Sequence, residues 1–234
     1  MRKQNEMIDA TLAVLLFVLM IASLYAVFLW VPRERTMGDV QRIFYFHVSA
    51  AMTSFVAFFL VFVGSVGYLI KRETGWDRMA ACSAELGLLM IAITLLTGPI
   101  WAKPVWGIWW TWDMRLTTSL VLGLIYLAYL MLRAYVFDKE KRANLSAVVG
   151  IIGFLDVPLV YFSIRWWRTQ HPSPVILGGE GSGLAPEMRL VMWLCVLTFV
   201  LFFSWLLRFR LRQQDMKDEA DYLRETLFAM RGDR

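Results

Sequence analysis

Apolar residues in this chain gather in six long runs that are separated by shorter polar segments. A membrane-spanning helix needs about 20 mostly apolar residues, and the runs approach or exceed that length. They occupy residues 10–30, 43–70, 79–100, 116–137, 145–164 and 190–207. None shows the alternation typical of a strand in a transmembrane barrel. The pattern therefore predicts an all-α integral membrane protein with six transmembrane helices.

Composition agrees with this interpretation, because 59% of the 234 residues are apolar and only 18% are charged. Such a chain is too hydrophobic for a soluble domain. The first run is too long for a signal-peptide core and has no small-residue cleavage site before Trp30, so we expect a retained helix. We expect a membrane domain over residues 1–207 and a charged cytoplasmic tail over residues 208–234. Cys82 and Cys195 lack the spacing of a disulfide framework or a zinc site.

The distribution of Lys and Arg predicts which side of the membrane each end of the chain faces. With the N-terminus inside, sixteen of the 24 cations fall on the inner side and eight on the outer side. Positive charge is enriched in cytoplasmic segments, so we expect both termini in the cytoplasm. This bias and the basic tail account for the net charge of +5, which therefore gives no reason to invoke nucleic acid.

A tryptophan-rich segment at residues 101–117 reads W-A-K-P-V-W-G-I-W-W-T-W-D-M-R-L-T and holds five indoles. Interpreted as a helix, it places Trp106, Trp109, Trp110 and Asp113 at i, i+3, i+4 and i+7 on one face. That face would be a flat aromatic shelf with polar edges. In the predicted topology the segment lies on the outer side of the membrane.

Such a shelf suits a large planar ligand that carries negative groups at its rim, and haem fits this description. Indole faces stack on a planar ring, and Lys103 and Arg115 can neutralise carboxylates. The alternative is an ordinary interfacial aromatic belt, but a belt populates both interfaces. The tryptophans at the predicted outer boundary number eight of eleven: Trp30, Trp101, Trp106, Trp109, Trp110, Trp112, Trp166 and Trp167. This asymmetry favours a binding role.

The chain has only two histidines, and both map to the predicted outer side. His47 lies near the start of the second predicted helix, and His171 lies in the last outer loop. Imidazole is a common ligand of haem iron, and two imidazoles on opposite faces complete its coordination. For either histidine taken alone, a structural hydrogen-bonding role is the favoured interpretation. Their shared side, with the indoles between them, favours iron ligation.

Two acidic residues fall within predicted spans, where ionisable groups are candidates for function. Glu85 lies near the inner end of the third helix, where it can reach the interface or pair with Arg78. Asp156 lies two residues before Pro158, and a protonated carboxyl there can satisfy backbone groups that the proline leaves free. We prefer this structural role for Asp156 over proton transfer.

The C-terminal tail begins with arginines and continues as a charged segment. Leu223, Leu227 and Met230 share one face if the tail is helical. We expect a solvated helix, and contact with a cytoplasmic partner subunit is the alternative.

The run W-G-x-W-W-x-W-D-x-R at residues 106–115 resembles the tryptophan-rich signature of haem-handling proteins in cytochrome c maturation. Within that group, the length, the six helices and the two outer histidines resemble the CcmC family, also called haem exporter protein C. Three further stretches carry the resemblance: T-G-P-I-W-A-K-P at 97–104, R-I-F-Y-F-H-V at 42–48 and W-W-R-T-Q-H at 166–171.

The resemblance implies a multi-pass protein of the cell inner membrane with an outer-face haem platform that faces the periplasm. It implies that haem b is held transiently and without a covalent bond, and is then passed to the haem chaperone CcmE. Further implied partners are the ATPase CcmA, the permease-like CcmB and the small membrane protein CcmD. The haem iron is assigned to His47 and His171. The implied platform residues, with the added cation Lys103, are Trp106, Gly107, Trp109, Trp110, Trp112, Asp113 and Arg115.

A haem carrier is therefore the function that the sequence favours, rather than an enzyme. One alternative is a transporter that moves haem across the bilayer, which would need a polar or aromatic path to the inner side. A second alternative is a cytochrome c synthetase, which shares the tryptophan-rich signature. By resemblance, proteins of that type are longer chains with further histidines in their helices, and this chain has none beyond His47 and His171.

Overall fold

The computed structural model describes residues 2–167, 169–171 and 183–232 of the chain. Its six long helices are α1 (Arg2–Tyr25), α2 (Ile43–Lys71), α3 (Thr74–Trp106), α4 (Met114–Tyr135), α5 (Lys139–Trp166) and α6 (Pro186–Gly232). Two short helices, η1 (Ala26–Trp30) and η2 (Asp39–Arg42), lie between α1 and α2. All six long helices are long and apolar enough to span a membrane, and the described residues contain no strand. The predicted all-α fold with six spans is confirmed.

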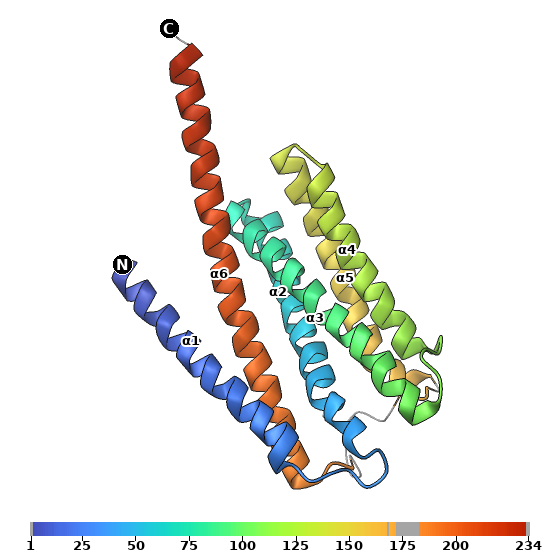
Figure 1. The fold of residues 1–234 in the computed structure, drawn as a ribbon. Coiled ribbons are helices and arrows are strands. Elements are labelled where there is room, and N and C mark those ends of the chain that lie inside the picture. Colours follow the sequence, from blue (N-terminus) through green and yellow to red (C-terminus); the bar gives the residue numbers. More distant parts are fainter. Residues whose placement is uncertain (1, 168, 172–182, 233–234) are drawn as a thin grey trace.

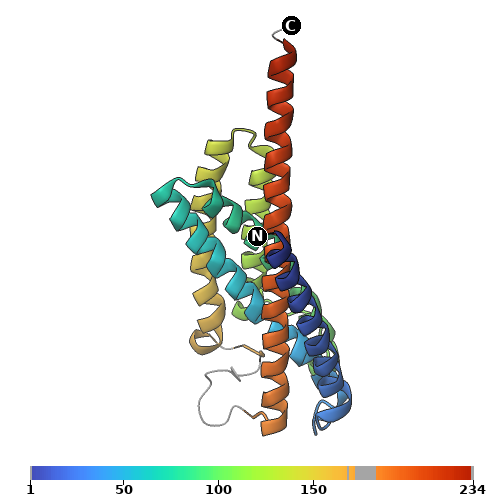
Figure 2. The same cartoon turned by 90° about the vertical axis from the view of Figure 1, so that its left-hand side faces the viewer.

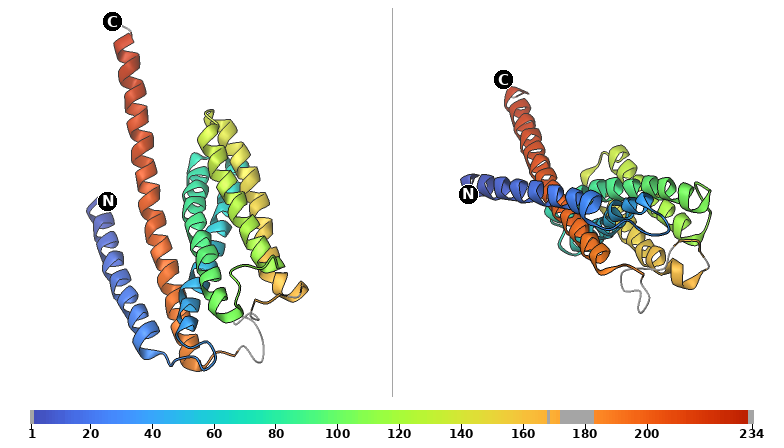
Figure 3. Two further views of the ribbon diagram at one scale, coloured as in Figure 1. Left: turned by 45° about the vertical axis from the view of Figure 1, so that its right-hand side comes forward. Right: turned by 60° about the horizontal axis from the view of Figure 1, so that its bottom comes forward.

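The helices run side by side, and both termini lie at the same end of the bundle (Figure 1). We call this the terminal end. The opposite end, which we call the tryptophan end, holds the link from η1 to α2 and the loop from α3 to α4 (Figure 3). Which end faces the cytoplasm stays a prediction from the cation count.

Helices α2 to α5 form the main core, and close backbone approach makes that core tight. Phe58 of α2 stacks on Tyr126 of α4, with ring centroids 3.8 Å apart and an interplanar angle of 4°. A β-carbon added at Gly87 of α3 would lie 2.6 Å from the Phe58 ring, so only glycine fits there. Lipid tails are as apolar as these side chains, so packing contacts rather than removal from water hold such helices together.

Helix α1 stands apart from this core, meets α6 near the tryptophan end and diverges from it toward the N-terminus (Figures 1 and 3). Only 22% of its most apolar stretch is buried inside the protein. A buried hydrogen bond joins Ser23 Oγ of α1 to Thr198 Oγ1 of α6 over 2.9 Å. Within a membrane such a pair satisfies two hydroxyls that lipid would leave unpaired.

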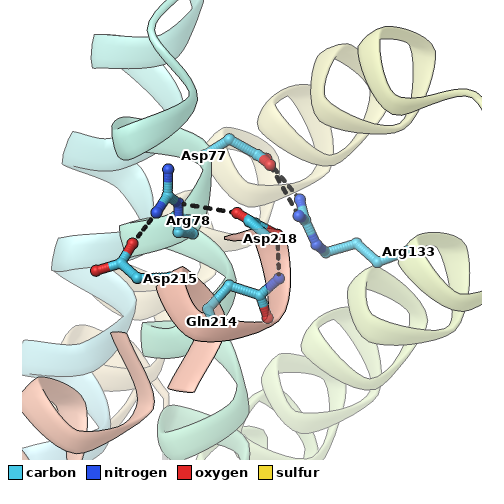
Figure 4. A network of polar contacts seen from close by, with 6 residues as sticks. All are labelled: Asp77, Arg78, Arg133, Gln214, Asp215 and Asp218. Carbon is cyan, nitrogen blue, oxygen red and sulfur yellow. Dashed lines mark hydrogen bonds and ion pairs between the residues drawn. The ribbon is translucent and has the colours of Figure 1, made fainter. Parts of the chain in front are cut away.

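Glu85 binds Arg210 of α6, with Oε2 2.6 Å from Nη2 and 2.8 Å from Nε. The predicted alternative of an ion pair between Glu85 and Arg78 is therefore wrong. Arg78 instead contacts Asp215 and Asp218 of α6 (Figure 4). The α6 helix, folding alongside α3, brings these charges together from positions far apart in the sequence.

Another ion pair at the terminal end is bidentate: the Arg133 guanidinium of α4 donates to both carboxylate oxygens of Asp77 of α3, over 2.5 and 2.8 Å (Figure 4). Helix α6 also continues without a break across residues 207 and 208, so the tail begins as a direct extension of the last span.

Asp156 is buried in α5, and its Oδ2 atom has no hydrogen-bond partner among the described residues. The predicted bond from Asp156 to backbone groups near Pro158 is not made by this oxygen.

Cys82 and Cys195 are both buried free thiols.

Candidate functional site

The tryptophan-rich segment does not form the continuous helix that its spacing suggested. Helix α3 ends at Trp106, and Gly107 adopts the left-handed conformation with φ of 79°. The Gly107 N–H donates to Lys103 O over 2.9 Å, which closes the last turn. Residues 107–113 then form a loop. The prediction that Trp106, Trp109, Trp110 and Asp113 share one helical face is wrong, because the glycine ends the helix between them.

Asp113 has a structural task at the other end of this loop. Its Oδ1 atom accepts a hydrogen bond from the Leu116 N–H over 3.1 Å, which caps the first turn of α4. Its Oδ2 atom accepts a second bond from Thr111 Oγ1 over 3.0 Å. The carboxylate therefore fixes where the loop ends and α4 begins.

The indoles form two edge-to-face pairs instead of one flat shelf. Trp101 and Trp106 lie 5.0 Å apart between ring centroids at 85°, and Trp110 and Trp112 lie 5.7 Å apart at 76°. Trp112 is 75% exposed and Trp109 is 57% exposed. The segment thus presents two open indoles beside three that are more enclosed, namely Trp101, Trp106 and Trp110.

The two cations of the segment also make local bonds. Lys103 Nζ donates to Gly107 O over 2.8 Å, so it satisfies the carbonyl just beyond the C-terminal end of α3. Arg115 Nη1 donates to Val160 O over 2.7 Å and to Tyr161 O over 3.4 Å. Arg115 therefore fastens the start of α4 to α5.

His47 is held by a hydrogen bond between two helices. Its Nδ1 atom lies 3.0 Å from Thr97 Oγ1 of α3, and the same hydroxyl lies 2.7 Å from Ile93 O. A threonine hydroxyl has one proton, which the Ile93 carbonyl takes, so the oxygen accepts from Nδ1–H of His47. In the tautomer that makes this bond, Nε2 carries a lone pair.

His171 lies at the same end of the bundle, between α5 and α6. Its backbone N–H donates to Thr169 Oγ1 over 3.0 Å. The imidazole of His47 interacts electrostatically with His171 and with Arg115. The structure thus brings together three of the residues that the sequence assigns to the site. Iron ligation by the two histidines stays a prediction.

Four buried polar atoms near this end have no hydrogen-bond partner among the described residues: Trp101 Nε1, Trp110 Nε1, Thr117 Oγ1 and Tyr161 OH. Buried donors in native proteins are nearly always paired, so these groups fit a ligand with acceptor atoms at its edge. Thr97 and Tyr161 had no predicted role, and Trp101 was expected only as one of the eight outer tryptophans. Thr97 and Trp101 belong to the quoted motif at 97–104, whereas Tyr161 carried no signal in the sequence.

Comparison with known proteins gives a consistent result. The family model described as "Heme exporter protein C" matches residues 2–225 of this chain. The "Heme exporter protein C" of Haemophilus influenzae is 31% identical over 189 residues, which cover 81% of this chain and 77% of that protein. The protein of the same name from Bradyrhizobium diazoefficiens is 31% identical over 172 residues, covering 74% of this chain and 65% of the relative.

A third similar protein is the "Putative cytochrome c biosynthesis ccmC-like mitochondrial protein" of Marchantia polymorpha. It is 32% identical over 172 residues, which cover 73% of this chain and 72% of the relative. The resemblance that the sequence motifs indicated is confirmed.

Proposed function

We propose that this chain, which belongs to the Heme exporter protein C family, binds haem at the tryptophan end of its bundle. It then passes the haem to a second protein during the maturation of c-type cytochromes. The proposal treats haem as a cargo that is held for transfer, without a covalent bond.

The hydrogen bond between His47 and Thr97 is the observation that supports the proposal most strongly. A metal-ligating histidine usually donates its other ring N–H to a fixed acceptor, which sets the tautomer and the ring orientation. Thr97 is such an acceptor, because its own proton is engaged by Ile93 O. The Nε2 lone pair of His47 is then available for iron.

The neighbouring residues supply the other needs of a haem site. His171 is the proposed second iron ligand, from the segment that follows α5. The indoles of Trp109 and Trp112 offer exposed aromatic surface for stacking, and the unpaired N–H groups of Trp101 and Trp110 can donate to haem carboxylates. Gly107, Asp113 and Arg115 act on the protein side by fixing the loop that carries the indoles.

We place the tryptophan end on the periplasmic face of the inner membrane, with both termini in the cytoplasm, because positive charge gathers at the terminal end. From this position the exposed indoles can meet a soluble receiving domain. The proposed receiver is the haem chaperone CcmE, and the ATPase CcmA, CcmB and CcmD are the proposed partner subunits. The proposed site would hold and orient a ligand, and we propose a carrier rather than an enzyme of its own.

Haem content tests this proposal. The parent chain and two variants are purified from haem-replete cells, and bound haem per chain is measured. We expect Trp110→Ala to lower the haem content, because it removes an unpaired donor and an edge-to-face partner. Trp205→Ala is the matched control, because Trp205 stacks on Phe202 and Phe209 of α6, far along the chain from the site. An equal loss in both variants would contradict a site at the tryptophan end.

A further inference from the structure

Helix α6 continues well beyond the rest of the bundle at the terminal end (Figures 1 to 3). We call residues 213–232 the α6 extension, which at about 1.5 Å per residue is about 30 Å long. Arg78 of α3 fastens its base through Asp215 and Asp218 (Figure 4). Beyond Asp218, no hydrogen bond or ion pair joins the described part of α6 to another helix. In proteins most of the stability of a helix comes from packing of its apolar face rather than from helix propensity, so the extension gains from a partner.

Apolar residues on the extension follow a coiled-coil spacing. Steps of four, three, four and three residues separate the members of this seam, which are Met216, Ala220, Leu223, Leu227 and Met230. A repeat of 3.5 residues keeps such a stripe facing one partner helix along its whole length. Each of the four large side chains is more than half exposed. The spacing thus indicates what kind of surface covers the seam, namely another helix.

The seam begins at a hollow of about 390 Å³ on α6. Its lining residues are Phe209, Arg212, Gln213, Asp215 and Met216. Phe209 is half exposed and precedes Met216 by seven residues, so it continues the same stripe toward the membrane. The hollow gives the first turn of an added helix a place to pack against α6.

Charge along the seam distinguishes between possible partners. Lys217 and Arg224 occupy equivalent positions, one heptad apart, on the same flank of the seam. In parallel coiled coils, residues on these flanks pair with charges on the partner helix. Two copies of this chain in one membrane would be parallel. Lys217 of one copy would then lie opposite Arg212 of the other. Only Arg224 would face an acidic residue, Glu219. A second copy therefore offers an opposite charge to Arg224 but not to Lys217.

We infer that the α6 extension binds a helix from a different protein, which has apolar residues at the same spacing and carboxylates beside them. This surface is separate from the haem site, and its function does not depend on haem binding. The four exposed apolar side chains provide the contact area, and Lys217 and Arg224 select an acidic partner.

A designed peptide tests the inference on the full chain in lipid nanodiscs. The probe has about four heptads with Leu at both seam positions and Glu on both flanks, and a second peptide has Lys in place of Glu. We expect fluorescence anisotropy to show binding of the Glu peptide and not of the Lys peptide. The double variant Lys217→Glu with Arg224→Glu should bind the Glu peptide with about tenfold lower affinity and should bind the Lys peptide instead.

Two matched variants test the seam itself. Leu227→Glu should abolish binding of the Glu peptide, because it puts a charge into the contact. Phe228→Glu should leave the affinity unchanged, because Phe228 is equally open but faces away from the seam. Both side chains are exposed, so neither variant should disturb folding. Equal binding of the two peptides, or equal effects of the two variants, would overturn the inference. A purified parent chain that is a dimer, and becomes a monomer with Leu227→Glu, would overturn it in favour of a second copy.

Discussion

The Nδ1 atom of His47 lies 3.0 Å from Thr97 Oγ1, across the packed faces of α2 and α3. These residues are 50 positions apart in the chain, and the bond forms because α2 and α3 lie side by side. Since Thr97 donates its own proton to Ile93 O, it acts on the imidazole only as an acceptor. Thr97 is therefore a positioning residue for His47.

Thr97→Val should weaken haem binding, because valine keeps the shape of threonine but removes the acceptor. Loss of a bond behind a metal-ligating histidine typically costs about 10- to 100-fold in metal affinity. Thr97→Ser keeps the hydroxyl and is the control. Haemin titration of both variants in detergent measures the effect, and a valine variant that binds as tightly as the parent would rule out the positioning role.

Asp113→Ala should destabilise the start of α4 by about 1 kcal/mol, because an N-cap acceptor is lost. Asp113→Asn and Asp113→Ser retain an oxygen that can accept from the Leu116 N–H, so they should keep both stability and haem. Thermal unfolding and haem content are measured on the three variants. If the asparagine variant loses haem as completely as the alanine variant while staying folded, the carboxylate charge itself contacts the ligand.

Asp156→Asn should leave protein level and haem transfer unchanged. The amide has nearly the shape of the carboxyl, and Oδ2 of Asp156 makes no hydrogen bond within the described chain that the change would break. Immunoblotting and a transfer assay with the receiving chaperone test this expectation. A normal protein level with no transfer would instead show that the carboxyl takes up or releases a proton.

Thiol labelling tests the orientation of the bundle. A cysteine at Ile108, in the exposed α3–α4 loop, should react with an impermeant reagent added outside cells, and one at Glu140 should not. The native thiols of Cys82 and Cys195 are buried, so the background should be low. Labelling at Glu140 in sealed right-side-out membranes would reverse the proposed orientation.

The six spans could be predicted because a run of about 20 apolar residues has few other stable uses. The shape of the tryptophan segment could not, because helical spacing says nothing about Gly107, whose left-handed conformation ends α3. Closeness in sequence favours Arg78 as the partner of Glu85, but folding places Arg210 of α6 beside it. In each case the missing information was a backbone conformation or a contact between distant segments.

The same limit explains what the sequence revealed of the site. His47, His171 and the indoles could be selected by residue type and by their predicted side of the membrane. Thr97 belongs to the motif at residues 97–104, but its role depends on the packing of α2 against α3, which no local pattern encodes. Arg115 was assigned to the ligand by its charge, whereas the structure shows that it also bonds carbonyls of α5.

The most direct test of haem ligation by His47 and His171 is the absorption spectrum of the purified, haem-loaded chain beside those of His47→Ala and His171→Ala. Two imidazole ligands give a six-coordinate iron, and removal of either should change the spin state even where some haem stays on the indoles. We expect each variant to lose the parent's ferric and ferrous spectra, and added imidazole to restore them. If both variants keep the parent's spectra at full haem occupancy, the two histidines do not ligate the iron and the central claim is wrong.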